Sequence, residues 1–280
     1  MGVYTCEGTA LTQYKFSRSS FRSRVFWLFL ALGLLLVGLL ALPLLALVLR
    51  AMRRDFFDYA LMPAAIAALR LSLVTSLTSV VLSVLTGTPL AYGLAHWKFH
   101  GRGALELLID LPVVLPPSVA GLGLLITFGR QGLVGQYLTP LGISIPFTSL
   151  AVILAQTFVS APLYIRAARL GFEGIDHQLE ESAVVEGASQ WQLFSHIMLP
   201  LAGRAMLSGA VLCWTRALGE FGATILFAGN LEGVTQTMPL AIYLGFESNL
   251  GLAVALSVVL ILVSVLLLAL IRRLDSRGRG

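Results

Sequence analysis

Charged residues are scarce in this chain of 280 residues. Only 12% are Asp, Glu, Lys or Arg, against the roughly 25% of a typical soluble protein, while 57% are hydrophobic. So much apolar surface excludes a single core covered by water, and the surrounding solvent must be lipid. Lipid forces every backbone hydrogen bond to be satisfied internally, which leaves helix bundles and closed β-barrels. The apolar runs are continuous rather than alternating, so they predict an all-α integral membrane protein.

Cysteine is scarce as well, and several functional motifs are missing. The two cysteines, Cys6 and Cys213, form no spaced pair, which argues against a disulfide framework or a metal site. The sequence has no G-x-x-x-x-G-K-[ST] phosphate-binding loop, and therefore no ATP site of its own. It also has no pattern that combines a nucleophile with a base. We therefore expect neither an enzyme nor a cofactor-binding protein.

The apolar residues fall into six segments that are candidates for membrane spans. The first, 25–49, is too long for the core of a cleaved signal peptide, which has about 7–15 residues, so we expect it to be retained. The segment 105–128 contains Asp110 and three prolines, and is predicted to be a span that is broken at its start. The remaining predicted spans are 70–95, 148–170, 202–228 and 248–271.

The distribution of Lys and Arg predicts the orientation in the cell membrane. With the tail 1–24 inside, the cytoplasmic segments 1–24, 96–104, 166–204 and 272–280 hold thirteen Lys and Arg, and the outer segments hold five. Cytoplasmic loops are enriched in these residues, so both termini are expected in the cytoplasm. The same distribution explains the net charge of +5 without a nucleic-acid partner. Only the outer segment 50–55, RAMRRD, opposes this orientation.

A charged stretch between two predicted spans carries helix signals. Asp176 is a candidate N-cap for a helix over 177–186, which Gly187 ends by adopting a left-handed conformation. The sequence S-Q-W-Q at 189–192 has the form of a capping box and predicts the start of a second helix over 190–198. The stretch is therefore expected to form a helix, a tight turn and another helix on the cytoplasmic side.

The second of these helices has apolar residues on both sides, and Pro200 follows it, where it suits the first turn of the next span. One side is expected to rest on the bundle and the other to meet a partner protein. A helix that lies on the membrane surface explains the pattern equally well. The apolar residues concerned are Trp191, Leu193, Phe194 and Ile197.

This stretch resembles a known family motif. Glu181-Ser-Ala183, Gly187 and Ile197-Met-Leu-Pro200 match the spacing of the EAA loop of ABC importer permeases, except at the second position, where serine replaces alanine. The resemblance implies an ABC importer permease with six transmembrane helices, over a permease domain at 65–275 with a coupling loop at 173–200. In that family the loop is a cytoplasmic coupling helix that docks on a separate ATP-hydrolysing subunit. The residues implied in this docking are Glu181, Ala183, Gly187, Trp191, Ile197 and Pro200.

Two charged residues, Arg216 and Glu220, lie inside a predicted span, where charges are expensive and mark functional sites. Their spacing lets each neutralise the other. Two interpretations stay open: the pair is structural, or Arg216 faces the translocation path and meets an anion while Glu220 sets its orientation. The small residues expected to pack closely at a dimer seam are Gly219, Gly222 and Ala223.

Two segments resemble molybdate transport permeases. R-A-L-G-E-F-G-A-T at 216–224 and L-P-V-V-L-P-P at 111–117 are similar to segments of that group, and sulfate permeases have a version of the first. The resemblance implies an oxyanion importer for molybdate, with tungstate, sulfate or thiosulfate as alternatives. It also implies alternating access, cytoplasmic ATP-binding cassette subunits, an extracytoplasmic oxyanion-binding protein and a second copy of the chain, surrounded by membrane lipid.

Four residues are candidates for the translocation path: Arg216, Glu220, Ser118 and Thr224. The prolines before Ser118 either kink a span at the membrane boundary or border an unwound segment of the path. A rival of a different class is an ion-coupled secondary transporter in which Glu220 or Asp110 carries a proton.

Overall fold

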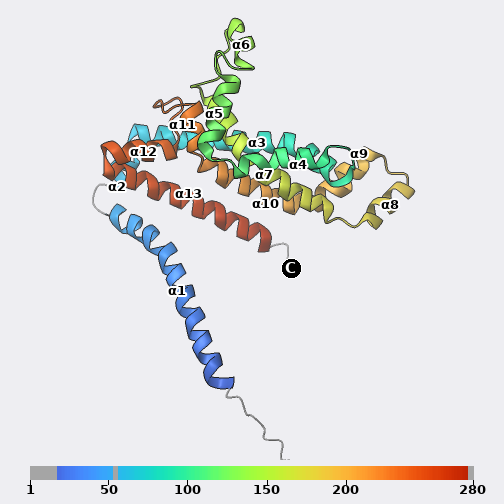
Figure 1. Ribbon diagram of the computed structural model, residues 1–280, viewed down its shortest axis with the longest axis horizontal. Coiled ribbons are helices and arrows are strands. Elements are labelled where there is room, and N and C mark those ends of the chain that lie inside the picture. Colours follow the sequence, from blue (N-terminus) through green and yellow to red (C-terminus); the bar gives the residue numbers. More distant parts are fainter. Residues whose placement is uncertain (1–17, 53–55, 277–280) are drawn as a thin grey trace, which may run out of the picture. The chain divides into compact units, whose positions relative to one another are not determined.

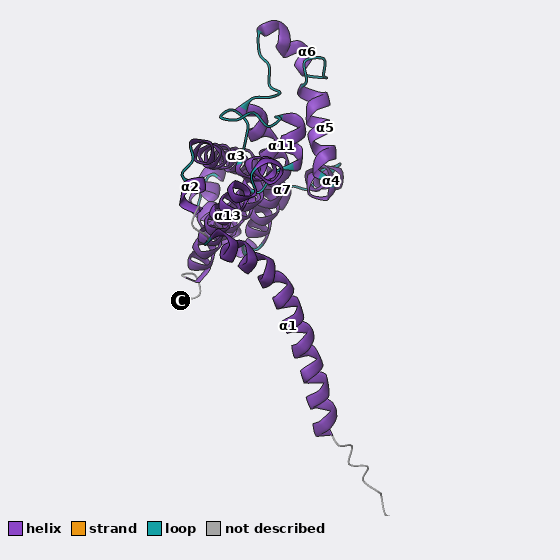
Figure 2. Cartoon of the chain, turned by 90° about the vertical axis from the view of Figure 1, so that its left-hand side faces the viewer, coloured by secondary structure: helices purple, strands orange, loops and turns teal. Residues whose placement is uncertain are grey.

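The computed structural model describes residues 18–52 and 56–276, and every regular element in these ranges is a helix (Figure 1, Figure 2). Most of the predicted tail, residues 1–17, lies outside the described ranges. The chain divides into two compact units, Met1–Arg50 and Ala51–Gly280.

The first unit is essentially one helix, α1 (Arg18–Ala51). Its apolar part, Phe26–Ala51, is long enough to cross a membrane and covers the range predicted for the first span. The side chains from Phe26 to Leu45 are all exposed, so apolar surface surrounds the helix on every side. Such a helix requires lipid or other protein around it.

The second unit holds the other helices. They are α2 (Phe56–Ala60), α3 (Pro63–His96), α4 (Arg102–Val114), α5 (Pro117–Phe128), α6 (Gly135–Leu138), η1 (Thr139–Leu141), α7 (Ser149–Glu173), α8 (His177–Val185), α9 (Gln190–Gln192), η2 (Leu193–Met198), α10 (Leu199–Leu218), α11 (Gly222–Phe227), α12 (Met238–Ser248) and α13 (Leu250–Ser276). Within this unit, α8 and α9 lie at one end, and α2 and α12 lie at the other (Figure 1).

Five described helices are long and apolar enough to span a membrane, and a bent pair, α4 and α5, makes a sixth if it counts as one span. The five are Phe26–Ala51, Pro63–His96, Ser149–Glu173, Gln190–Leu218 and Leu250–Ala269. This confirms the predicted all-α membrane architecture.

The centre of the second unit is the contact of α3 with α7 and α10. Small polar side chains line it: the hydroxyls of Ser79 and Thr157 lie 2.9 Å apart, and those of Thr88 and Tyr164 lie 2.5 Å apart. Trp214 of α10 donates from its indole Nε1 to Ser76 Oγ at 3.0 Å. Small residues and hydrogen bonds hold helices together where lipid removes the hydrophobic driving force.

The predicted single span over 202–228 is wrong. Helix α10 ends at Leu218, and the short helix α11 starts only at Gly222. Glu220 explains the break, because one oxygen of its buried carboxylate accepts the backbone N–H of Ala223 at 2.8 Å. A continuous helix would already have used that N–H in its own ladder.

The segment 105–128 is broken in its middle rather than at its start. Helices α4 and α5 meet at Leu115 and Pro116 and differ in direction by 115°. Both residues have extended backbone, and the prolines at 116 and 117 lack the N–H groups that a continuous helix needs. Helix α4 lies along α7, whereas α5 leads away from the bundle in both views, with α6 at its far end (Figure 1, Figure 2).

Candidate functional site

The predicted helix and turn before the second cytoplasmic helix are confirmed. Asp176 caps α8 by accepting the N–H of Gln178 at 2.9 Å. Gly187 follows the helix with φ +91°, a left-handed conformation that costs glycine little. Its N–H bonds to the carbonyl of Val184 and the next N–H bonds to the carbonyl of Ala183, which is a Schellman ending.

The second helix starts with the predicted capping box. The N–H of Ser189 donates to Gln192 Oε1 at 2.8 Å, and the N–H of Gln192 donates to Ser189 Oγ at 3.3 Å. Helix α10 begins at Leu199 with Pro200 in its first turn, as predicted, but α9, η2 and α10 follow one another without a break from Gln190 to Leu218. Since η2 is π-helical, the proline's missing N–H is accommodated without ending the helix.

The two sides of this coupling stretch, residues 173–200, differ in exposure. Ala183 is 8% exposed and Leu193 4%, and both pack into the core beneath α3 and α7. Trp191 is 71% exposed, and Glu181 and Pro200 are exposed as well. The stretch therefore rests on the bundle with one side and presents the other, as the apolar pattern predicted.

A cleft of about 800 Å³ lies between the end of α3 and α8. At its wall, Glu180 Oε1 lies 3.4 Å from His96 Nε2 and 3.5 Å from His177 Nδ1. The His96 ring also stacks on Tyr92, with ring centroids 4.4 Å apart. These contacts tie the end of α3 to the start of the coupling stretch.

The structure brings Arg216 and Glu220 together. Arg216 Nη1 donates to Glu220 Oε2 at 2.6 Å. The Glu220 side chain is 1% exposed, whereas that of Arg216 is 34% exposed. Both carboxylate oxygens of Glu220 therefore have donors, and the guanidinium keeps an open side.

The other two path candidates, Thr224 and Ser118, differ in exposure. Thr224 sits in α11, fully buried, and its Oγ1 has no hydrogen-bond partner in the described part of the chain. Ser118 is exposed on the first turn of α5. Helices α5 and α11 are packed against each other, so all four candidates belong to one region.

The small residues of α11 serve this contact within one chain. A Cβ added at Gly222 would come 2.6 Å from Pro117 Cβ, and one at Gly121 would come 2.7 Å from the carbonyl oxygen of Ala223. The expected role of Gly222 and Ala223 at a dimer seam stays a prediction, and within the chain both residues already serve the contact of α5 with α11. They let the backbones of α5 and α11 approach closely.

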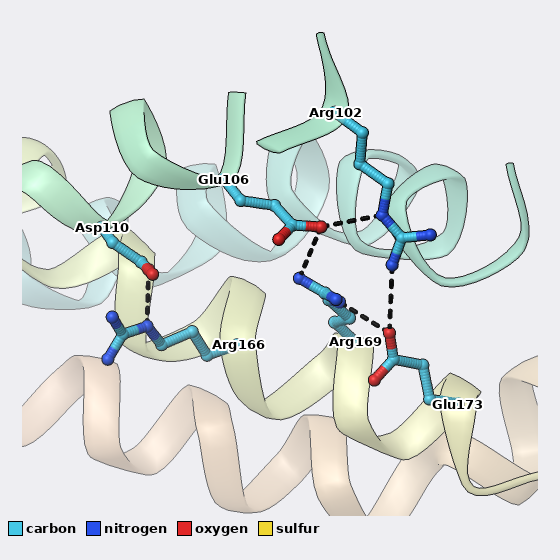
Figure 3. A network of polar contacts seen from close by, with 6 residues as sticks. All are labelled: Arg102, Glu106, Asp110, Arg166, Arg169 and Glu173. Carbon is cyan, nitrogen blue, oxygen red and sulfur yellow. Dashed lines mark hydrogen bonds and ion pairs between the residues drawn. The ribbon is translucent and has the colours of Figure 1, made fainter. Parts of the chain in front are cut away.

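A charge ring between α4 and α7 was missed by the sequence analysis (Figure 3). Arg102 contacts Glu106 at 2.8 Å and Glu173 at 3.5 Å, and Arg169 contacts the same two carboxylates at 3.0 and 2.7 Å. Further along the same helices, Arg166 Nε lies 2.5 Å from Asp110 Oδ1. The signal for α4 was present, because residues 102, 106 and 110 share one face of a helix.

Comparison with known proteins assigns the family. Residues 79–280 match the model of the binding-protein-dependent transport system inner membrane component. The chain belongs to this family. It is therefore a transport component and a multi-pass membrane permease.

Individual relatives are similar in sequence to this chain over most of their length. The putative molybdenum transport system permease protein YvgM of Bacillus subtilis is 39% identical over 222 residues, covering 76% of this chain and 98% of the relative. ModB of Mycobacterium tuberculosis, a molybdenum transport system permease protein, is 44% identical over 211 residues, covering 75% and 80%. The sulfate transport system permease protein CysT of Escherichia coli is 35% identical over 224 residues, covering 80% and 81%.

A solved structure agrees in fold. The bacterial ABC transporter involved in the import of the acidic polysaccharide alginate has a chain that matches with a TM-score of 0.72 at 18% identity. The match covers 92% of this permease and 96% of that chain. At this identity the likeness concerns the fold alone.

Proposed function

We propose that this chain is the permease subunit of an ATP-driven ABC importer that carries molybdate across the cell membrane. The observation that carries the proposal is the similarity to molybdenum transport permeases, which reaches 39% identity over 98% of the Bacillus subtilis relative. The run at 216–224 is the local counterpart of that similarity.

Sulfate is the second candidate, because the sulfate permease of Escherichia coli is 35% identical over 81% of its length. Molybdate, tungstate and sulfate are all tetrahedral dianions, so one permease path suits each of them. A separate binding protein is expected to make most of the distinction, with thiosulfate as a further substrate of the sulfate type.

The energy would come from partner subunits that hydrolyse ATP in the cytoplasm and dock on the coupling stretch. Its exposed side suits such a docking surface, since Trp191 is 71% exposed and Glu181 is exposed as well. The assembly would contain two copies of this chain and receive its substrate from an extracytoplasmic oxyanion-binding protein, with both termini in the cytoplasm. The proposed docking residues are Glu181, Gly187, Trp191, Ile197 and Pro200, whereas the buried Ala183 would hold the stretch on the bundle.

The proposed translocation path runs past the α5–α11 region. Arg216 uses one nitrogen for Glu220 and keeps further N–H donors on its open side, which suits an oxyanion. Ser118 and Thr224 supply hydroxyls on the two helices of this region. Alternating access would expose the region first to the outside and then to the cytoplasm.

The rival secondary transporter is less well supported. It needs a carboxylate free to carry a proton, but both oxygens of Glu220 accept hydrogen bonds, and Asp110 is paired with Arg166. It would also leave the coupling stretch without a purpose.

Labelled molybdate uptake tests the substrate. Cells or proteoliposomes carrying the permease with its ATPase and binding protein are assayed with and without a large excess of sulfate. Uptake that needs ATP and ignores sulfate supports the molybdate importer. Uptake that sulfate abolishes moves the assignment to sulfate, and uptake that follows a proton gradient without ATP overturns the importer altogether.

The substitution Gly187→Pro tests the coupling role, since proline cannot adopt the φ of +91° found there. We expect the protein to insert normally, while uptake and copurification of the ATPase subunit are lost. Gly203→Ala is the matched control, because an added Cβ there meets no atom within 4 Å. Normal uptake by the proline variant would contradict the coupling role.

A further inference from the structure

The charge ring is a closed cycle of alternating charges. Going round it, Arg102, Glu106, Arg169 and Glu173 each contact both neighbours, so two arginines share two carboxylates (Figure 3). Two sides of the cycle lie within a helix, at a spacing of i,i+4, and two cross from α4 to α7. The ring is thus electrically neutral and attaches one helix to the other at two points.

Its position is at the base of the coupling stretch. Glu173 is the last residue of α7, and the backbone turns at Gly174 toward α8. Arg102 is the first residue of α4. A displacement of the coupling stretch at its α8 end therefore acts on a helix end that the ring joins to α4.

From α4 a packed route leads to the pair formed by Arg216 and Glu220. Helix α4 continues through the bend at 115–116 into α5. The backbones of α5 and α11 then approach each other closely at Gly121 and Ala223. The N–H of Ala223 donates to Glu220, which holds Arg216. Four successive contacts thus join the end of α7 to the proposed path.

The side chains of the ring are 26–33% exposed, so each ion pair by itself contributes little to the stability of the fold, and what the ring adds comes from the four pairs together. Since each carboxylate serves two arginines, the pairs can exchange partners while α4 and α7 shift against each other.

We propose that the ring is a mechanical joint of the transport cycle, and that its four residues are positioning residues that pass motion of the coupling stretch through α4 and α5 to the Arg216–Glu220 pair. The proposal rests on the proposed function as an ATP-driven importer. It predicts that breaking the two interhelical contacts uncouples ATP hydrolysis from transport without preventing assembly.

Charge exchange within single helices isolates these interhelical contacts. The double variant R102E/E106R keeps the net charge and keeps opposite charges within α4. Across the two helices, however, it places each exchanged residue opposite a residue of the same charge on α7. R169E/E173R does the same from the α7 side. The combination of all four substitutions restores opposite charges across the helices.

The readout is the amount of labelled molybdate taken up per ATP hydrolysed, in proteoliposomes that contain the complete complex. Each double variant is expected to lower this ratio about tenfold, and the fourfold variant to return it to within about twofold of wild type. ATP hydrolysis and copurification of the ATPase subunit should persist throughout. Asp110→Asn, which opens the neighbouring pair but leaves the ring intact, is the control expected to keep the ratio.

Three outcomes would overturn the joint: an unchanged ratio in both double variants, a fourfold variant that does not recover, or a parallel loss of ATPase activity and uptake at constant ratio. The last outcome would make the ring purely structural. The same conclusion follows if the double variants fold poorly, the fourfold variant folds normally, and the uptake per ATP hydrolysed is the same in all of them. Failure of the proposed function is distinguished by the wild-type complex, which would then show no ATP-dependent molybdate uptake. If it transports sulfate instead, the same ratios are measured with sulfate.

Discussion

The same local motif, an arginine followed four residues later by a glutamate, occurs in two very different settings. In the charge ring it forms Arg102–Glu106 and Arg169–Glu173, with side chains 26–33% exposed and each glutamate serving two arginines. At Arg216–Glu220 the glutamate is 1% exposed and has one arginine and one backbone N–H as its donors. Identical spacing thus gives a shared, partly exposed network in one place and a single pair with a buried carboxylate in the other.

The difference is one of energy and of purpose. Removing one partner of a buried pair leaves an uncompensated charge and costs about 3–5 kcal/mol, whereas an exposed pair contributes about 0.2–1 kcal/mol. The buried pair therefore fixes one arrangement of α10 and α11. The ring holds α4 and α7 loosely enough to be rearranged, which is what a moving joint needs.

The largest predicted effect comes from one substitution made in both settings. Arg216→Ala leaves the buried Glu220 carboxylate without its cation, and we expect the free energy of unfolding to fall by about 3–5 kcal/mol, with loss of uptake. Arg102→Ala should lower the free energy of unfolding by about 1 kcal/mol or less. Denaturant unfolding of both variants in the same detergent measures the two values. Equal decreases in the free energy of unfolding would show that side-chain exposure does not determine the cost of losing the arginine. This result would contradict the contrast between the two settings.

The second prediction concerns the packing that keeps the buried pair in place. Gly121→Ala puts a Cβ 2.7 Å from the backbone oxygen of Ala223, which cannot move aside alone, so we expect a destabilisation of about 1–3 kcal/mol. Gly123→Ala, on the same helix, meets no atom within 4 Å and should be neutral, or stabilising by up to about 1 kcal/mol. Thermal unfolding of the two variants measures the difference. A loss of similar size at Gly123 would contradict the close contact of α5 with α11.

Local rules made the coupling stretch predictable. Asp176, Gly187 and Ser189 act within a few residues of themselves, through an N-cap, a left-handed turn and a capping box, and each was found where the sequence indicated. The family resemblance of the same stretch rests on the same short-range pattern. Nothing distant has to be known to predict it.

The broken spans were not predictable in the same way. The end of α10 at Leu218 depends on Glu220 taking the N–H of Ala223, and composition cannot show that choice. The close approach of Gly222 to Pro117 was not predicted, because the two residues are about a hundred positions apart in the sequence. The ring was not predicted for a related reason. The apolar composition of 105–128 predicts a span, although the charged residues of α4 recur on one face of the helix.

The smallest predicted effect separates the two settings by salt. At about 0.1 M salt the Debye length is roughly 10 Å, and at about 1 M it is roughly 3 Å, so added salt screens exposed pairs and leaves buried ones largely unaffected. Glu106→Gln should lower the free energy of unfolding only slightly at the lower salt concentration, and by nearly nothing at the higher. The cost of Arg216→Ala should be nearly the same at both.

Unfolding measured at the two salt concentrations, with Asp110→Asn as a second exposed variant, tests this prediction. If the Glu106→Gln penalty persists at high salt, the ring is shielded from solvent and is too rigid for a joint whose pairs exchange partners. If the Arg216→Ala penalty falls with salt instead, the open side of that arginine admits enough water and ions for Glu220 to be screened. The contrast between the two settings would then be one of degree.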